Sequence, residues 1–105
     1  MKEAVGSTDL ISTEVEMMQF KDALKERVKD VAGLFQVYVE VFPEEVRVVS
    51  VLEQDGFDET VENQIYDIHY DFLDRFDLPM RFLCLPRSVI HTVAPSRGAE
   101  LIFSK

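Results

Sequence analysis

Two aspartates and one histidine, Asp67, His69 and Asp71, lie within five residues of one another. Carboxylates and imidazoles serve as metal ligands and as general acids and bases, so their spacing decides whether they can act together. On a helix of about 100° per residue, Asp67 and Asp71 share a stripe, whereas His69 points to nearly the opposite side. One ion cannot collect ligands from both sides, and the spacing does not match the two-histidine zinc motif. We therefore predict no metal and no cofactor, and interpret the aspartates as a solvated face.

The histidine of this group belongs to the apolar side of the expected helix, with Glu62 close in angle two turns earlier. A half-buried histidine beside a carboxylate can titrate near neutral pH, which is one interpretation. The interpretation that we favour is a histidine at the edge of the core with a backbone hydrogen-bond partner. A small enzyme or ligand-binding protein is the alternative, and its pocket is expected at the sheet ends, lined by Glu62, His69, Arg81 and His91.

Other residue types that could support catalysis are isolated in this chain. Cys84 lies in the apolar segment MRFLCL without a His or Cys partner at catalytic spacing, so we expect an unreactive thiol. His91 lies near Ser88, but no nucleophile-elbow motif is present there. The glycines form no phosphate-binding loop of either common kind. These patterns favour a protein without enzymatic activity.

Residues 53–77 carry most of the net charge. They hold nine acids against one base, a balance of −8 out of −9 for the chain. The same segment places Tyr66, Tyr70 and Leu73 in a second apolar stripe beside the expected core stripe. This second stripe either packs against the first helix or forms a contact surface, because tyrosine is enriched at interfaces. We favour a non-enzymatic interaction module that forms a homodimer, built on this stripe or on the edge near residues 99–103. The alternative partner is another protein, for example a basic one.

Composition restricts the remaining classes of function. A pI near 4.6 disfavours binding to nucleic acid phosphates, although residues 78–105 have a local balance of +3 and leave a nucleic-acid-associated protein as a further alternative. No run approaches the ~20 apolar residues of a membrane span, so no membrane partner is expected. The single cysteine is typical of a reducing cytoplasm, and the first residues do not resemble a signal peptide.

Periodicity and breakers predict the elements that must position these residues. Helices are expected over 13–31, with Thr13 as N-cap, and over 58–76, with Asp58 as N-cap. Strands are expected over 34–42, 46–53 and 80–85, and a short edge strand over 99–103. Residues 1–12 are expected to be flexible, because Gly6 and the two residues after it interrupt the pattern. Gly33 is expected to cap the first helix.

This order, α-β-β-α-β with a possible last β, predicts a single α+β domain over residues 1–105. We expect a two-layer sandwich with both helices on one face of a three- to four-stranded mixed or antiparallel sheet. The second helix would form a right-handed crossover if the strands on either side of it are parallel.

The chain resembles small uncharacterised bacterial α/β proteins of about this length. The resemblance rests on Val37-Tyr38-Val39 and Val48-Val49-Ser50-Val51 in the hairpin, on Ile65-Tyr66-Asp67-Ile68 in the helix and on the segment Gly98-Ala99-Glu100-Leu101-Ile102-Phe103. It spans most of residues 34–103. It implies a bacterial cytoplasmic domain of unknown function, and it assigns no site residues.

Overall fold

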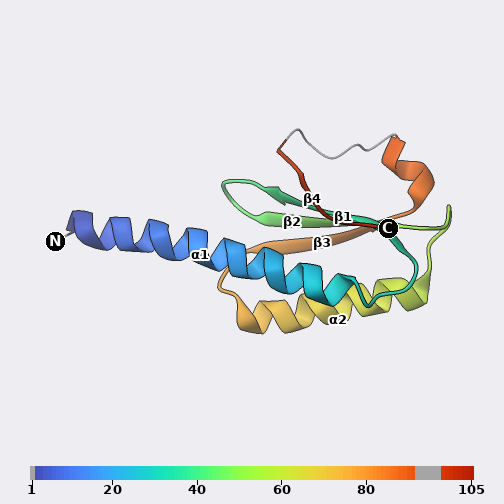
Figure 1. Ribbon diagram of the computed structural model, residues 1–105, viewed down its shortest axis with the longest axis horizontal. Coiled ribbons are helices and arrows are strands. Elements are labelled where there is room, and N and C mark those ends of the chain that lie inside the picture. The colour runs from blue at the N-terminus through green and yellow to red at the C-terminus, as the bar shows by residue number, and fades with distance from the viewer. Residues whose placement is uncertain (1, 92–97) are drawn as a thin grey trace.

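The computed structural model describes residues 2–91 and 98–105, and the side chains of residues 14–89 and 98–105. Along the chain lie helix α1 (Lys2–Val28), strands β1 (Leu34–Val41) and β2 (Val46–Leu52), helix α2 (Glu59–Arg75), strand β3 (Met80–Leu85), the short 3-10 helix η1 (Arg87–His91) and strand β4 (Glu100–Ser104). Figure 1 shows α1 and α2 on one side of the sheet. The predicted α+β class is confirmed, and so is the last strand.

The sheet has four strands in the order β3-β2-β1-β4. β1 pairs antiparallel with β2 and with β4, whereas β2 pairs parallel with β3. A parallel pair needs a crossover connection, and α2 supplies it. The order leaves β3 and β4 as the two edges of the sheet. Each edge strand pairs with a strand that is distant in the sequence, β3 with β2 and β4 with β1. The positions of the two edges therefore cannot be predicted from local sequence.

The first helix differs from its prediction over 13–31. It begins at Lys2, so the expected flexible segment 1–12 is helical from residue 2 onward, and Thr13 is an interior position and not the N-cap. A glycine inside a helix costs only about 1 kcal/mol, which tertiary and neighbouring helical context can offset. The helix ends at Val28, and the amides of Asp30 and Val31 close the last turn on Arg27 and Val28. Gly33, at φ +92°, then turns the chain into β1.

The second helix agrees with its prediction to within one residue at each end. The carboxylate of Asp58 accepts hydrogen bonds from the amides of Thr60 (3.0 Å) and Val61 (3.3 Å), so the predicted N-cap is confirmed. Phe76 follows the helix in an extended conformation, and its amide still donates to the carbonyl of Phe72, so the helix ends here, before the segment Asp77-Leu78-Pro79. The end of α2 is fixed to α1, because the amide of Asp77 donates to Glu16 (2.8 Å).

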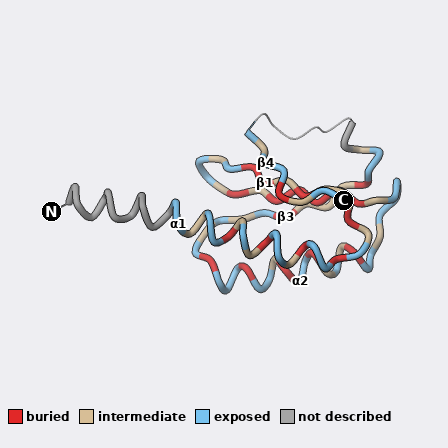
Figure 2. Tube along the Cα trace, in the orientation of Figure 1, coloured by how far each residue is buried: buried red, intermediate tan, exposed pale blue. Residues whose placement is uncertain are grey.

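The core lies between the helices and the sheet, where the buried residues gather in Figure 2. Phe20 of α1 meets Phe72 and Phe76 at the end of α2 with ring centroids 5.5 and 5.4 Å apart. Phe82 of β3 contributes a third side to this cluster, 6.4 Å from Phe72. These contacts place α2 beside α1 and over β3. None of the described helices is both long and apolar enough to cross a membrane.

Candidate interaction surface

The exposed flank of α2 carries Tyr66, Tyr70 and Leu73, which we call the tyrosine stripe. Their spacing of four and three places them in one line along the helix. Their side chains are exposed by 40%, 68% and 49%, which is unusual for large apolar groups in a line. The predicted alternative, that the stripe packs against α1, is wrong. The flank of α2 that faces α1 is a different one, on which Asp71 accepts a hydrogen bond from Arg27 at 2.8 Å.

The tyrosine stripe lies on the side of α2 that borders the edge strand β3. His69, next to the stripe, stacks its ring on Phe82 of β3 at 4.6 Å between centroids and 12° between planes. Tyr66 lies close enough to Cys84 of β3 and to Glu62 for both to raise the pKa of its hydroxyl, after the larger effect of burial. The stripe and the open edge of β3 therefore form one continuous surface.

The backbone of β3 shows which of its groups face this open edge. The amide of Val46 in β2 donates to the carbonyl of Pro79 at 2.9 Å, and Val46 pairs with Met80. In a parallel ladder this fixes the alternation, so Arg81, Leu83 and Leu85 direct their N–H and C=O groups toward β2. Met80, Phe82 and Cys84 direct theirs away from the sheet. A row of such outward groups is a template for pairing with another strand.

The edge position of β3 was not predicted from the sequence, because only residues 99–103 were expected at an edge of the sheet. Two signals mark residues 80–85 as an edge strand. Pro79 and Pro86 stand at its two ends, and Arg81 places a charge inside an otherwise apolar strand. Proline and isolated charges are typical of edge strands, and here the prolines lie outside β3 and the side chain of Arg81 lies on a face of the sheet, so the outward backbone groups stay free to pair.

His69 is held by ring stacking, on Phe82 and, at 6.2 Å, on Tyr70. Burial lowers the pKa of its imidazole below the ordinary value. Because burial disfavours the charged form, the ring is neutral at pH 7. The interpretation of His69 as a residue at the edge of the core agrees with this position, but among the described residues ring stacking takes the place of the expected backbone hydrogen bond.

The thiol on the same surface is also neutral. Burial, with a smaller contribution from the charge of Glu62, raises the pKa of Cys84 to about 12. The thiolate is the nucleophilic form, so at neutral pH Cys84 behaves as a small apolar residue. The β3 side of α2 is thus mainly uncharged, apart from Glu62.

The predicted pocket of Glu62, His69, Arg81 and His91 is not assembled by the fold. Glu62 and His69 do share the β3 side of α2. Arg81 alternates with Phe82 and so lies on the opposite face of the sheet, where its Nε is 3.4 Å from Glu45. The side chain of His91 lies outside the described residues.

The basic residues of the C-terminal segment that are described each have a partner. Arg81 pairs with Glu45, Lys105 with Glu53, and the guanidinium of Arg87 lies 4.0 Å from the ring centroid of Phe35. Arg97 lies outside the described residues. Cations that are engaged in this way are poorly placed for phosphate contacts, so the alternative of nucleic-acid binding gains no support from residues 14–89 and 98–105.

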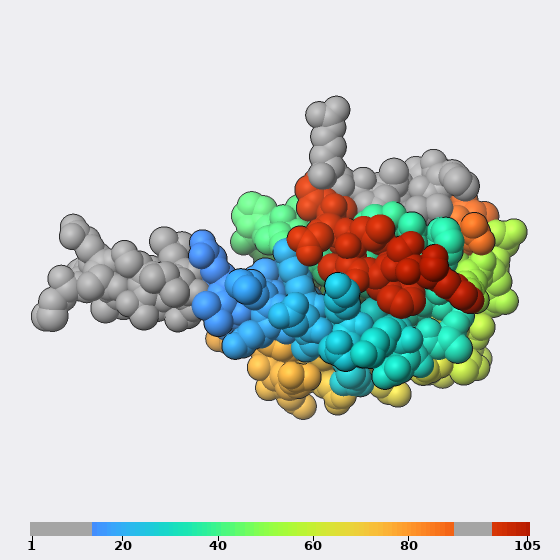
Figure 3. All heavy atoms as spheres, in the orientation of Figure 1, coloured from blue at the N-terminus to red at the C-terminus, as the bar shows by residue number. Residues whose placement is uncertain are grey.

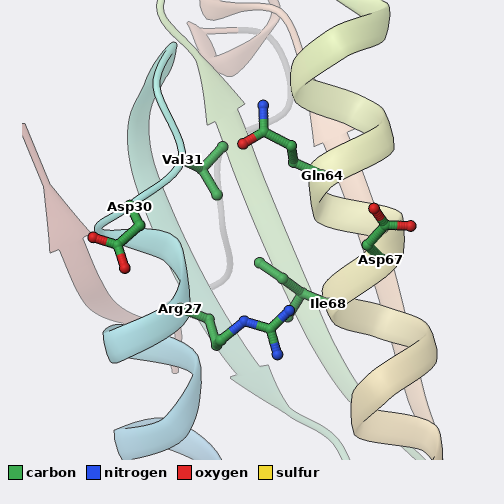
Figure 4. Close-up of a pocket in the computed structure, with 6 residues that line it drawn as sticks. All are labelled: Arg27, Asp30, Val31, Gln64, Asp67 and Ile68. Carbon is green, nitrogen blue, oxygen red and sulfur yellow. The ribbon is translucent and has the colours of Figure 1, made fainter.

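A groove of about 230 Å³ runs between the end of α1 and α2, lined by Arg27, Asp30, Val31, Gln64, Asp67 and Ile68. Figure 4 shows the guanidinium of Arg27 in the space between the helices, with the carboxylates of Asp30 and Asp67 on its two walls. Arg27 is already engaged by Asp71, as described above. Within the described part of the chain, no group of three or more His, Cys, Asp or Glu side chains could hold a metal ion.

Comparison with known proteins finds no relative of this chain: no protein-family model, curated protein or solved structure matches it significantly. The resemblance to small bacterial proteins therefore stays a prediction. The case for function rests on the geometry of the surface itself.

Proposed function

We propose that the protein is a non-enzymatic interaction module that forms a homodimer through the tyrosine stripe and the adjacent edge of β3. The observation that carries this proposal is the alignment of three exposed large side chains beside an unpaired strand edge. Isolated exposed apolar residues are ordinary, whereas a contiguous patch bordered by open backbone groups is typical of a contact surface.

The size of the surface supports a specific contact. At about 200 Å² for each of the three side chains, the exposed fractions of 40%, 68% and 49% amount to roughly 300 Å². A stable interface buries about 800 Å² per partner, so the stripe supplies somewhat more than a third, and the edge of β3 with its flanking residues supplies area for the rest. Tyrosine also contributes a large contact area at a low cost in side-chain entropy.

The chemistry of the same surface supports a contact and gives little support to catalysis. Cys84 is protonated, His69 is neutral and stacked, and Asp71 is engaged by Arg27. A general acid or base needs a pKa near the working pH and access to a substrate. An uncharged aromatic flank needs neither.

Light scattering after size-exclusion chromatography tests the proposal. We expect a particle of twice the 12.1 kDa chain mass, and we expect added salt to tighten the dimer, because two chains of net charge −9 repel each other. Tyr70→Glu should give a monomer, since it places a charge in the contact. Phe57→Glu is the matched control, because Phe57 is exposed to the same extent (67%) but lies in the loop before α2. A wild-type chain that stays monomeric at ~100 μM in high salt would contradict the proposal.

A further inference from the structure

We infer that the two copies join by antiparallel pairing of β3 with β3 of the second copy, about a two-fold axis at Phe82. This inference rests on the proposed homodimer and specifies how it is built. The result is a single sheet that runs through both copies, with the two α2 helices side by side over the junction. Two features of the structure point independently to the same position of the axis, and a third shows that strand pairing and helix contact are compatible.

The first feature is the row of outward backbone groups on Met80, Phe82 and Cys84. In an antiparallel pair, residues that face each other directly exchange both hydrogen bonds or neither. With the axis at Phe82, Met80 meets Cys84 of the second copy and Phe82 meets its own equivalent, so every outward N–H and C=O of these residues is paired. Moving the axis to Leu83 puts Pro86 opposite Met80, and proline has no N–H to donate. The axis at Phe82 is therefore the position at which the three outward residues of β3 pair with one another.

The second feature is the position of the tyrosine stripe along β3. His69 stacks on Phe82, so His69 and Tyr70 are the residues of α2 that lie level with Phe82. A two-fold axis at Phe82 therefore passes next to this point of the helix. Tyr66 and Leu73 lie four and three residues from Tyr70, on either side of it. Since the two-fold axis makes the helices antiparallel, Tyr66 meets Leu73 of the second copy, and the two Tyr70 side chains meet near the axis. The stripe is thus centred on the axis that the backbone groups select.

The third feature is the spacing of the layers. Strands lie about 4.8 Å apart, and the two-fold axis lies half of that distance outside β3. A crossover helix lies over the two strands that it connects, here β2 and β3, so the axis of α2 is expected about one strand spacing from the two-fold axis. The two α2 helices are then about 10 Å apart, which is the upper end of the ordinary packing distance of 8–10 Å. Pairing of the strands and contact of the stripes can therefore occur together.

The charges near the junction do not prevent this pairing. Arg81 faces Leu83 of the second copy on the outer side of the sheet, where Arg81 keeps its ion pair with Glu45. At the ends of the helix pair, Glu62 approaches Asp77 of the second copy. This approach of like charges is a second reason to expect a tighter dimer in salt.

Cysteine cross-linking tests the position of the axis. In a Cys84→Ser background, which removes the single native thiol, one protein carries Arg81→Cys and another carries Leu83→Cys. Residues 81 and 83 of opposite copies form a pair without backbone hydrogen bonds, with Cα atoms about 4.5 Å apart, within the range of a disulfide. Residue 81 and residue 83 are each about 7–8 Å from their own equivalents. The mixture with oxidised glutathione should therefore give a disulfide-linked heterodimer, and each protein alone should not.

The other outcomes separate the inference from the proposal on which it rests. Cross-linking of Leu83→Cys with itself, without the mixed product, would place the axis at Leu83 and overturn the inference. No product above that of a Phe57→Cys control, in samples whose mass is still dimeric, would overturn strand pairing and leave the homodimer in place. A monomeric mass would overturn both.

Amide hydrogen exchange of the wild-type chain gives a second measurement that needs no variant. The amides of Arg81 and Leu83 point toward β2 and should be protected at every concentration. The outward amides of Phe82 and Cys84 should gain protection, on the order of 100-fold, only at concentrations where the dimer forms. Unchanged exchange of these two amides in the dimer would contradict β3 pairing.

Discussion

The two edges of the sheet carry similar backbone groups but opposite kinds of side chain beside them. At the β4 edge, α1 and β4 lie side by side in Figure 3, and Lys21 of α1 binds Glu100 of β4 at 3.2 Å. Lys25 follows Lys21 by one helical turn and is exposed, whereas Lys21 is partly buried. At the β3 edge, the flanking helix presents the tyrosine stripe. If the β3 edge is the contact surface that we propose, the side chains of the flanking helix are what distinguish it from the solvated edge at β4.

The largest effect is expected when apolar residues of the tyrosine stripe are replaced by lysines like those that flank the β4 edge. The double change Tyr66→Lys and Leu73→Lys should weaken the dimer at least ~100-fold, about 3 kcal/mol, because it replaces apolar contacts by charges that the contact would bury. Unfolding of the monomer should change by less than about 0.5 kcal/mol, since both side chains are exposed. Sedimentation equilibrium and chemical denaturation measure the two quantities.

The matched control for this change lies on α1. Val15 and Met18 are also exposed apolar residues, three positions apart, and Val15→Lys with Met18→Lys alters the net charge by the same amount. The control should remain dimeric. If the control dissociates and the stripe variant does not, the contact lies at the α1 end of the molecule.

A smaller effect is expected from the reverse exchange. Lys21→Tyr with Lys25→Tyr gives the β4 edge an aromatic flank and removes the ion pair to Glu100, which as an exposed pair contributes at most about 1 kcal/mol. The flank alone should add a weak second contact, so the particle mass should rise above that of a dimer at concentrations near 1 mM. Lys21→Gln with Lys25→Gln, which removes the charges without adding rings, should stay dimeric. A double tyrosine variant that also stays dimeric would show that an apolar flank is not sufficient.

The sequence was sufficient for the parts of this comparison that depend on local pattern. The N-cap residue Asp58 and the proline downstream, Pro79, predicted the two ends of α2. The spacing of four and three residues placed Tyr66, Tyr70 and Leu73 in one stripe. The sequence could not show that β3 would be an edge, because the strand order depends on pairing between β1 and β4, which are far apart in the chain. The alternation within residues 80–85 puts Arg81 and Phe82 on opposite faces, but only the packing of α2 shows which of the two faces His69.

The start of α1 shows a different limit of local pattern. Thr13 and Glu16 have the spacing of a capping box, but the same residues are tolerated inside a helix, so the pattern identifies a cap only where the helix in fact begins. The side chain of Glu16 instead accepts a hydrogen bond from the amide of Asp77, beyond the end of α2. That contact joins two segments that no local rule connects.

The smallest expected effect is a pH dependence that belongs to the β3 side alone. His69 stacks there on Phe82, whereas β4 and the facing flank of α1 contain no histidine. Burial lowers the folded-state pKa of His69 below its unfolded value of about 6.5. The neutral ring is therefore favoured by folding, so its contribution to stability is complete above pH 6.5 and is lost as the pH falls through the lower folded-state pKa. Because His69 is partly exposed, the loss should not exceed about 0.5 kcal/mol.

Denaturation of the wild type and of His69→Gln between pH 5 and 8 measures this loss. The free energy of unfolding of the wild type should fall toward pH 5 relative to that of the variant. If the two proteins show the same dependence on pH, the protonation of His69 is not coupled to folding.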